Sequence, residues 1–128
     1  MVADFPRTAR LLRPAEFKRV YDMRQSAASG PLVLYAAPNE LPVGRVRLGL
    51  SVSRRVGNAV VRNRWKRRLR EAFRAVRNAV PAGNDYILVV RGGEPGRGAE
   101  GLHRAAATIA ELAQRVTGRR GYGSGVGR

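Results

Sequence analysis

Hydrophobic residues recur along the chain at two spacings, and the shorter spacing marks the predicted strands. Residues 45–53 alternate without exception, with aliphatic side chains on one face and small or polar side chains on the other. This period of two is typical of a half-buried strand. Residues 32–37 and 86–90 are apolar runs, and the second suits a central strand covered on both faces. Residues 25–31 are small and polar, end in a Gly-Pro turn signal, and could hold a short edge strand.

The longer spacing predicts three helices. A first helix begins at Pro14, which suits a first helical position, and its apolar residues up to Tyr21 recur at helical spacing. Asn58 is a good N-cap for a second helix that runs to about residue 80, where a Pro-Ala-Gly-Asn turn stops it. Residues 99–116 carry one apolar stripe at helical spacing and predict the last helix.

These elements fit one domain, which we expect to span residues 1–117. Within it, residues 1–13 are basic and aperiodic and resemble an arm. Residues 118–128 are rich in Gly and Arg and contain a single large apolar side chain, Tyr122. Such a segment cannot bury a core, so we expect it to be a disordered tail.

The net charge adds a functional constraint. Lys and Arg number 25 and Asp and Glu number 9 among 128 residues, which gives a formal charge of +16. Self-repulsion at this density disfavours a compact state, and a bound polyanion relieves it. Nucleic acid is the first candidate, and an anionic membrane surface is the second. Nearly all the cations are arginines, whose guanidinium groups suit phosphate recognition, although codon usage in a GC-rich genome would also explain the excess.

Several classes of protein are excluded by composition. The chain has no cysteine, which rules out a disulfide framework, a thiolate zinc site and a thiol nucleophile. Its longest apolar run, residues 32–37, is far shorter than the ~20 residues that span a bilayer. The N-terminus lacks the continuous apolar segment of a secretory signal. We therefore expect a cytoplasmic location and no membrane partner.

The second helix carries the strongest functional signal. Residues 54–77 contain ten basic residues and one acid, Glu71. A helical wheel places the apolar residues within roughly a 120° arc and leaves a cationic exposed face. Like charges four residues apart destabilise a helix by ~0.2–0.5 kcal/mol per pair, and interleaved acids would avoid this loss. Polyanion binding explains the pattern better than a merely solvated face. A membrane-surface helix is disfavoured because the apolar arc is needed for the core.

The segment from residue 49 to residue 73, GLSVSRRVGNAVVRNRWKRRLREAF, resembles the signature of the bacterial ribonuclease P protein family. The core of the motif is Arg62-Asn63-Arg64, followed by Lys66-Arg67, Arg70 and Glu71. Residues 16–21, 32–35 and 85–91 also resemble the first helix and two strands of that family, so the likeness covers roughly residues 5–116. Trp65, where a smaller aliphatic residue is usual, and the Gly/Arg tail depart from the pattern.

The resemblance implies both a fold and an activity. The fold is an α/β (α+β) two-layer sandwich of αβββαβα order, with a mixed four-stranded sheet and a left-handed βαβ crossover. The implied function is that of the accessory subunit of an endoribonuclease. In this ribonucleoprotein an RNA subunit removes the 5′ leader from precursor tRNA with bound Mg²⁺. The implied partners are therefore the ribonuclease P RNA and precursor tRNA. The Mg²⁺ is held mainly by RNA, and no cofactor is intrinsic to the protein.

The resemblance also assigns two sets of site residues. The set expected to bind the RNA subunit comprises Arg54, Arg55, Arg62, Asn63, Arg64, Lys66, Arg67, Arg68, Arg70 and Arg74. The set expected to bind the single-stranded leader, in a cleft between the sheet and the first helix, comprises Phe17, Tyr21, Val33, Tyr35 and Ser51. Aromatic and small side chains along a groove suit sequence-tolerant stacking of unpaired bases. Taken without the resemblance, Phe17 and Tyr21 also fit as plain core residues.

The chain offers no candidate for protein catalysis. Its one histidine, His103, is expected on a helix surface beside Arg104. The nine acids are scattered, with no pair at close metal-ligand spacing, and Glu71 is expected to pair with a neighbouring arginine. We therefore predict no catalytic residue, and the metal ligands of the protein, if any, stay unknown.

Two other functions remain open. A ribosomal or other structural RNA-binding protein without a role in cleavage would have the same composition, and the motif between Arg62 and Glu71 is what argues against it. A DNA-binding module that inserts the basic helix into the major groove is the other. It is disfavoured because a helix placed between two strands matches none of the usual docking motifs.

Overall fold

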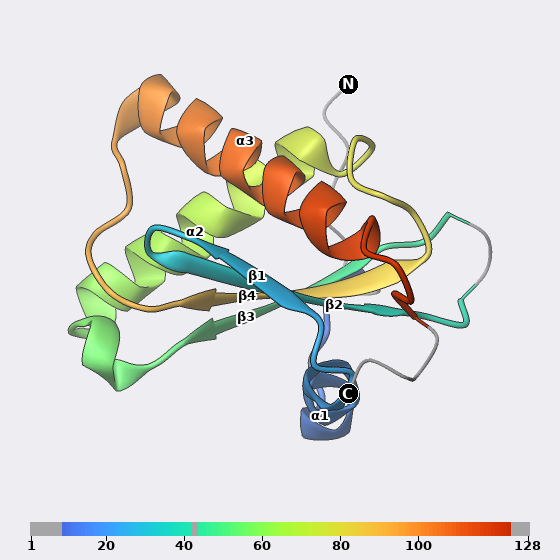
Figure 1. Ribbon diagram of the computed structural model, residues 1–128. Helices are drawn as coiled ribbons and strands as arrows, with labels where there is room; N and C mark the ends of the chain where they lie inside the picture. The colour runs from blue at the N-terminus through green and yellow to red at the C-terminus, as the bar shows by residue number, and fades with distance from the viewer. Residues whose placement is uncertain (1–8, 42–43, 124–128) are drawn as a thin grey trace.

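The computed structural model describes residues 9–41 and 44–123. Over these residues the chain follows the predicted order of elements (Figure 1). The elements are α1 (Pro14–Asp22), β1 (Ser26–Ser29), β2 (Leu32–Pro38), β3 (Arg47–Val52), the short 3₁₀ helix η2 (Arg54–Val56), α2 (Ala59–Val76), β4 (Asn84–Val90) and α3 (Gly98–Thr117). The αβββαβα order expected from the sequence is confirmed, including the short edge strand.

The four strands form one mixed sheet in the order β1-β2-β4-β3. β1 pairs antiparallel with β2, and β2 pairs antiparallel with β4. β3 and β4 are parallel neighbours, so the chain must cross over between them, and α2 provides this connection. This is the crossover for which the family resemblance implies a left-handed sense.

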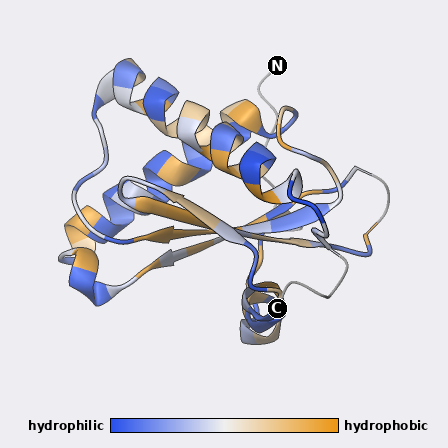
Figure 2. Ribbon diagram, viewed as in Figure 1, coloured by the Kyte–Doolittle hydropathy of each residue, from blue (hydrophilic) through white to orange (hydrophobic). Residues whose placement is uncertain are grey.

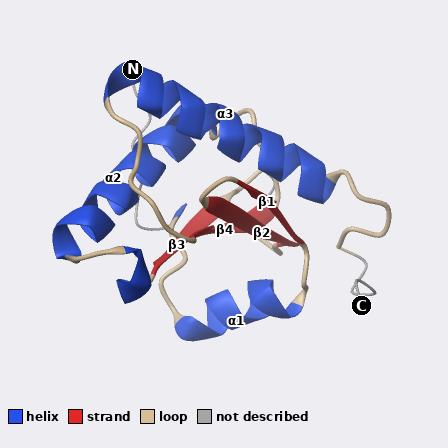
Figure 3. Ribbon diagram, turned by 60° about the vertical axis from the view of Figure 1, so that its left-hand side comes forward, coloured by secondary structure: helices blue, strands red, loops and turns tan. Residues whose placement is uncertain are grey.

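The sheet has helices on both faces, although they cover the two faces unequally (Figures 1 and 3). α2 and α3 pack against each other and against one face, where the main hydrophobic core lies. α1 lies across the opposite face and packs on β2 and β4 around a smaller cluster. The two expected layers are therefore present, and α1 adds a partial third. Because α1 is short, it leaves part of its face of the sheet uncovered.

The alternation of the strands explains which side chains reach each core. In β3, Leu48 is buried on the face that carries α2 and α3, whereas Gly49 faces α1. In β4 all residues except Val89 are buried, as expected of a central strand. Figure 2 shows that hydrophobic and hydrophilic positions alternate along α2 and α3, as expected of helices with one buried side.

α2 begins and ends for local reasons. The side chain of Asn58 accepts a hydrogen bond from the Val61 N–H at 3.0 Å, which confirms the predicted N-cap. The helix ends at Val76, earlier than the predicted residue 80. The N–H of Val80 still donates to the Val76 carbonyl at 3.0 Å, so one further turn carries Val80 into the core. Trp65 is buried, and its indole N–H donates to the Gly93 carbonyl at 3.0 Å, which ties α2 to the loop after β4.

The end of the expected N-terminal arm is part of the fold. Ala9 and Leu11 are buried, and the Leu11 N–H donates to the Leu48 carbonyl at 2.9 Å. Arg10 forms a parallel bridge with Leu48 on the open edge of β3. Hydrophobic contact thus holds this short segment, although its sequence has no regular period. The earlier part of the arm, residues 1–8, lies outside the described residues.

The structure also differs from the sequence expectation in the first part of the tail. Tyr122 is half-buried against the main core, and its hydroxyl lies 2.6 Å from the Asn84 side-chain oxygen. Burial raises the pKa of this hydroxyl, so it stays protonated and donates the hydrogen bond. A single aromatic side chain therefore fixes the segment to β4. Residues 124–128 lie outside the described part, and for them disorder remains a prediction.

Candidate nucleic-acid interface

One side of α2 forms a cationic surface. The helix buries Trp65, Leu69, Ala72 and Phe73, and the positions between them turn outward. These positions hold every candidate that the sequence analysis placed on this helix. We call them the basic face: Arg62, Asn63, Arg64, Lys66, Arg67, Arg68, Arg70 and Arg74, all exposed or half-buried. Arg54 and Arg55 lie exposed on η2, just before the helix, and extend this surface.

The charge of the basic face is poorly compensated. Glu71, expected to pair with a neighbouring arginine, is exposed and forms no ion pair with any described residue. The one ion pair of the basic face within the described residues joins Arg64 to Glu94 at 3.6 Å, and both side chains are more than half exposed. Such a pair contributes little to stability. The basic face is therefore arranged to meet negative charge from outside the chain.

Two arginines of the basic face lie in unfavourable environments. The Nε atom of Arg62 is shielded from solvent and finds no acceptor among the described residues. Burial, together with the nearby charge of Arg10, lowers the pKa of Arg70. A shielded donor without an acceptor is costly, so both environments are unfavourable in the unbound protein.

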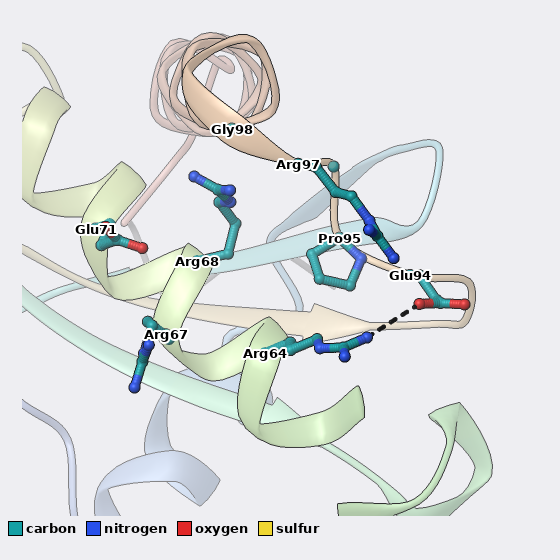
Figure 4. A pocket seen from close by; sticks show the side chains of 9 residues that line it. Arg64, Arg67, Arg68, Glu71, Glu94, Pro95, Arg97 and Gly98 are labelled. Carbon is teal, nitrogen blue, oxygen red and sulfur yellow. Dashed lines mark ion pairs between the residues drawn. The ribbon is translucent and has the colours of Figure 1, made fainter. Parts of the chain in front are cut away.

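A pocket of about 310 Å³ lies between α2 and the loop that leads to α3 (Figure 4). Arg64 extends across it toward Glu94, and Arg68 extends toward the start of α3 (Figure 4). Arg97 comes from the loop and adds a cation that the sequence analysis did not include. The helical wheel of α2 could not reveal this residue, because the fold alone brings residue 97 to the helix.

A second candidate surface lies on the side of the sheet that α1 only partly covers. Val33 of β2 pairs with Val89 of β4, and Val89 pairs with Ser51 of β3, so the three side chains form one row across the sheet. All three are half-buried, which leaves them accessible beside α1. Val33 and Ser51 were predicted. Val89 was missed because residues 86–90 are continuously apolar, and only the register with its neighbours shows which side it faces.

Aromatic side chains border this row. The rings of Phe17 and Tyr21 on α1 lie 6.4 Å apart, and the Tyr21 ring lies 4.8 Å from that of Tyr35 on β2, edge to face. Tyr21 also forms a hydrogen bond with Ser51, and burial raises the pKa of its hydroxyl. We call Phe17, Tyr21, Val33, Tyr35, Ser51 and Val89 the open face. The structure thus brings together all five residues predicted for this surface, and they are neither fully buried nor fully exposed.

Gly49 decides how close Phe17 comes to the sheet. A Cβ atom at Gly49 would lie 2.7 Å from the Phe17 Cζ atom, which is inside van der Waals contact. The Phe17 ring therefore lies over the glycine on β3. The small residues that alternate along residues 45–53 thus provide room for an aromatic ring.

A cluster of charged side chains fixes α1 on the sheet. Arg47 donates to Asp85 through Nε at 2.9 Å and through Nη2 at 2.7 Å, and to Glu16 on α1 at 2.8 Å. Arg19 of α1 also pairs with Asp85, which is completely buried and accepts a further bond from Asn39. These residues lie 31 to 66 positions apart in the chain, so no local sequence signal could have revealed the cluster. It sets the angle at which α1 carries Phe17 and Tyr21.

Other kinds of site find little support in the described residues. No group of three or more His, Asp or Glu side chains there could hold a metal ion. His103 is exposed on α3, as expected. None of the helices in the described part is long and apolar enough to cross a bilayer.

The fold and its two surfaces define a small α+β RNA-binding protein with a basic helix on one side of a mixed sheet and an aromatic face on the other. Residues 5–113 match the family model described as Ribonuclease P. The chain therefore belongs to the ribonuclease P protein family, as its resemblance suggested.

Curated relatives and solved structures agree with this assignment. The chain is 43% identical over 83 residues to the ribonuclease P protein component of Caldanaerobacter subterraneus. These aligned residues cover 65% of this chain and 70% of that protein. It is 36% identical over 111 residues to that of Desulfovibrio desulfuricans, covering 87% and 85%. The RNase P protein of Staphylococcus aureus has a similar structure, with a TM-score of 0.61, 28% identity and coverage of 86% and 93%. That of Thermotoga maritima gives a TM-score of 0.60, 25% identity and coverage of 83% and 92%.

Proposed function

We propose that this chain is the protein subunit of a bacterial ribonuclease P. In this proposal the basic face binds the catalytic RNA subunit, and the open face binds the single-stranded 5′ leader of precursor tRNA. The assembly removes the leader by endonucleolytic cleavage and gives the mature 5′ end of tRNA. The observation that carries the proposal is the presence, on one small domain, of a basic helix and a separate aromatic surface.

The chemistry of the basic face supports its assignment to the RNA subunit. A folded RNA presents closely spaced phosphates, and guanidinium groups bind them through paired hydrogen bonds. The basic face offers seven cations on one helix, and among the residues that the structure describes they form one ion pair, which is exposed. Asn63, exposed between Arg62 and Arg64, adds an amide that can bond a base edge or a ribose hydroxyl.

The chemistry of the open face supports its assignment to unpaired RNA. Half-exposed rings stack on bases of any sequence, and each stacked base contributes ~1–3 kcal/mol. Val33, Val89 and Ser51 provide a flat and nearly uncharged floor beside these rings. A duplex presents no free base faces, so this surface favours a single strand.

Catalysis is assigned to the RNA subunit in this proposal. The Mg²⁺ ions that cleavage requires are held mainly by the RNA subunit and the substrate. The described residues provide no carboxylate cluster to hold them. What the protein contributes is binding: it holds the leader on one side of the sheet and the catalytic RNA on the other.

Reconstitution tests the proposal. The full chain is added to a bacterial ribonuclease P RNA at a Mg²⁺ concentration too low for the RNA alone, and cleavage of a precursor tRNA is followed. We expect the protein to restore cleavage at the mature 5′ end. If the protein binds RNA tightly and leaves the cleavage rate unchanged, the alternative of a structural RNA-binding protein is correct.

A further inference from the structure

A small pocket connects the two surfaces. It has a volume of about 210 Å³ and lies where the N-terminal segment, α1, β3 and α2 meet. Three cations line it: Arg10 from the N-terminal segment, and Lys66 and Arg70 from α2. Its apolar wall includes Phe17 from α1 and Leu12, whose surface is 51% exposed.

The described residues that line the pocket bring positive charge to it and no negative charge. Among the described residues that line it, none is acidic, and Lys66 and Arg70 form no ion pair within the described part. Arg70 is half-buried, and its pKa is lowered by burial and then by the charge of Arg10. Three converging cations in a partly dry pocket repel one another, and one bound anion would reverse this unfavourable energy.

The position of the pocket indicates what the anion is. Phe17 belongs to the open face and also lines this pocket, so the row of aromatic rings leads directly into it. Lys66 and Arg70 belong to the basic face. The pocket sits at the edge of β3, where the N-terminal segment bridges to Leu48, and so lies between the two sides of the sheet.

We propose that this pocket binds one phosphodiester group of a single RNA strand, with Arg10, Lys66 and Arg70 on the phosphate and with Phe17 and Leu12 against the adjoining ribose or base. This inference rests on the proposed function and adds Arg10 to the RNA-binding residues. The strand is either the leader of precursor tRNA as it leaves the open face, or a segment of the catalytic RNA. Both present the same phosphodiester chemistry.

A cycle of protein and RNA changes tests the proposal. Precursor tRNAs are made with one neutral methylphosphonate linkage at successive leader positions, and each is bound to the ribonucleoprotein assembled from the full chain. Lys66→Gln/Arg70→Gln should weaken binding of unmodified RNA by about tenfold or more. For one of the modified RNAs, the same double substitution should weaken binding by less than about twofold. The phosphate charge that Lys66 and Arg70 would contact is already absent from that RNA.

Two further variants make the test specific to the pocket. Arg10 does not belong to the basic face. The weakening of RNA binding by Arg10→Gln should disappear at the same neutral linkage as the weakening by Lys66→Gln/Arg70→Gln. Arg104→Gln/Arg119→Gln removes the same charge from exposed positions on and after α3, and should show no coupling to any single linkage. Thermal unfolding of each variant confirms that it is folded.

The outcomes separate this proposal from the proposed function. Coupling at a leader linkage identifies the leader as the source of the phosphate. Coupling only at a neutral linkage placed in the catalytic RNA identifies that RNA instead. If wild-type protein binds both RNAs and supports cleavage, but Arg10 and the Lys66/Arg70 pair share no linkage, the pocket is not a phosphate site and the proposed function stands. If wild-type protein neither binds these RNAs nor supports cleavage, the proposed function itself fails.

Discussion

At the scale of single residues, Gly49 and Glu16 have the most specific roles in placing α1. Gly49 provides space for the Phe17 ring on the sheet. The Oε1 atom of Glu16 accepts from the N–H groups of Leu12 and Arg13, and its Oε2 accepts from Arg47. Each residue therefore controls the position of an aromatic side chain without itself belonging to the open face.

Gly49→Ala should displace the Phe17 ring, since the new methyl group would overlap it. We expect a loss of roughly 1–3 kcal/mol in the free energy of unfolding, as for other overpacked sites. Binding of precursor tRNA should weaken more than binding of mature tRNA, which has no leader. Gly92→Ala is the matched control, because no atom lies within 4 Å of a Cβ at that position. Equal affinity ratios for wild type and Gly49→Ala would contradict the role given to Phe17.

Glu16 should make stability depend on pH in the acid range. Burial alone would raise the pKa of its carboxyl, but the two backbone hydrogen bonds and the charge of Arg47 outweigh burial and lower the pKa. A depressed carboxylate pKa stabilises the fold above the ordinary glutamate pKa, and this stabilisation is lost as the pH falls through the depressed value.

Glu16→Gln should therefore be less stable than wild type at neutral pH, by about 1–2 kcal/mol. The difference should shrink as the pH falls below the ordinary glutamate range and through the depressed pKa of Glu16, where the wild-type carboxyl becomes protonated. Chemical denaturation at a series of pH values measures it. A constant difference across the acid range would show that the charge of Glu16 is unimportant.

At the scale of elements, α1 and α2 present the two candidate surfaces. The sequence left open whether Phe17 and Tyr21 are core residues or binding residues. In the structure both side chains are half-buried, so they are neither plain core nor fully exposed. α2 combines a fully buried stripe with the basic face. Changes to the outer positions of either helix should therefore affect binding more than folding.

Phe17→Leu/Tyr21→Leu keeps much of the apolar volume and removes the stacking surfaces. If these rings stack on leader bases, affinity for precursor tRNA should fall by roughly 1–3 kcal/mol per lost base contact, and affinity for mature tRNA should scarcely change. The measured quantity is the ratio of the two affinities, with thermal unfolding alongside. A preserved ratio in a folded double variant would assign both rings to the core.

Replacing Arg62, Lys66 and Arg70 with Ala should weaken binding to the catalytic RNA and make it less sensitive to salt. We expect the log–log salt slope to fall by on the order of one unit per lost phosphate contact, taking the duplex value as a guide. Folding should persist, because these positions lie off the buried stripe. An unchanged salt slope in the folded triple variant would rule out phosphate contacts by Arg62, Lys66 and Arg70.

The sequence predicted the elements better than it predicted their relations. Alternation in residues 45–53 and the Asn58 cap are local signals, and the structure confirms both. The side of the sheet on which Val89 lies depends on the register of β4 with its neighbours. The charged cluster around Asp85 depends on partners from α1 and β3. Tyr122 looked like part of a tail because its hydrogen-bond partner, Asn84, is 38 residues away. The spacing of hydrophobic residues thus predicts the helices and strands, whereas contacts between residues far apart in the chain become visible only in the folded structure.

At the scale of the whole molecule, net charge opposes folding. The chain carries +16 on 128 residues, and much of the positive charge is concentrated on α2 and η2. Within the described residues the carboxylates of Asp85 and Glu16 are used inside the fold, where they fix α1. They therefore do little to neutralise the basic face.

Stability should therefore increase with ionic strength. The Debye length falls from about 30 Å at 0.01 M to about 10 Å at 0.1 M, so added salt screens repulsion between the distant cations. We expect the midpoint of thermal unfolding to rise between these two concentrations of sodium chloride. Arg104→Gln/Arg119→Gln, which lowers the net charge by two, should show a smaller rise. A midpoint that falls with salt would mean that the ion pairs matter more than the repulsion.

The bridge between Arg10 and Leu48 also has a consequence for self-association. β3 forms one border of the sheet, and an open border is a template onto which a strand from another molecule can add. The N-terminal segment lies against this border, and its Leu11 N–H bonds the Leu48 carbonyl. A short segment of the chain thus protects the molecule from forming intermolecular sheets, and it does so most usefully when salt or RNA has neutralised the charges that otherwise keep the molecules apart.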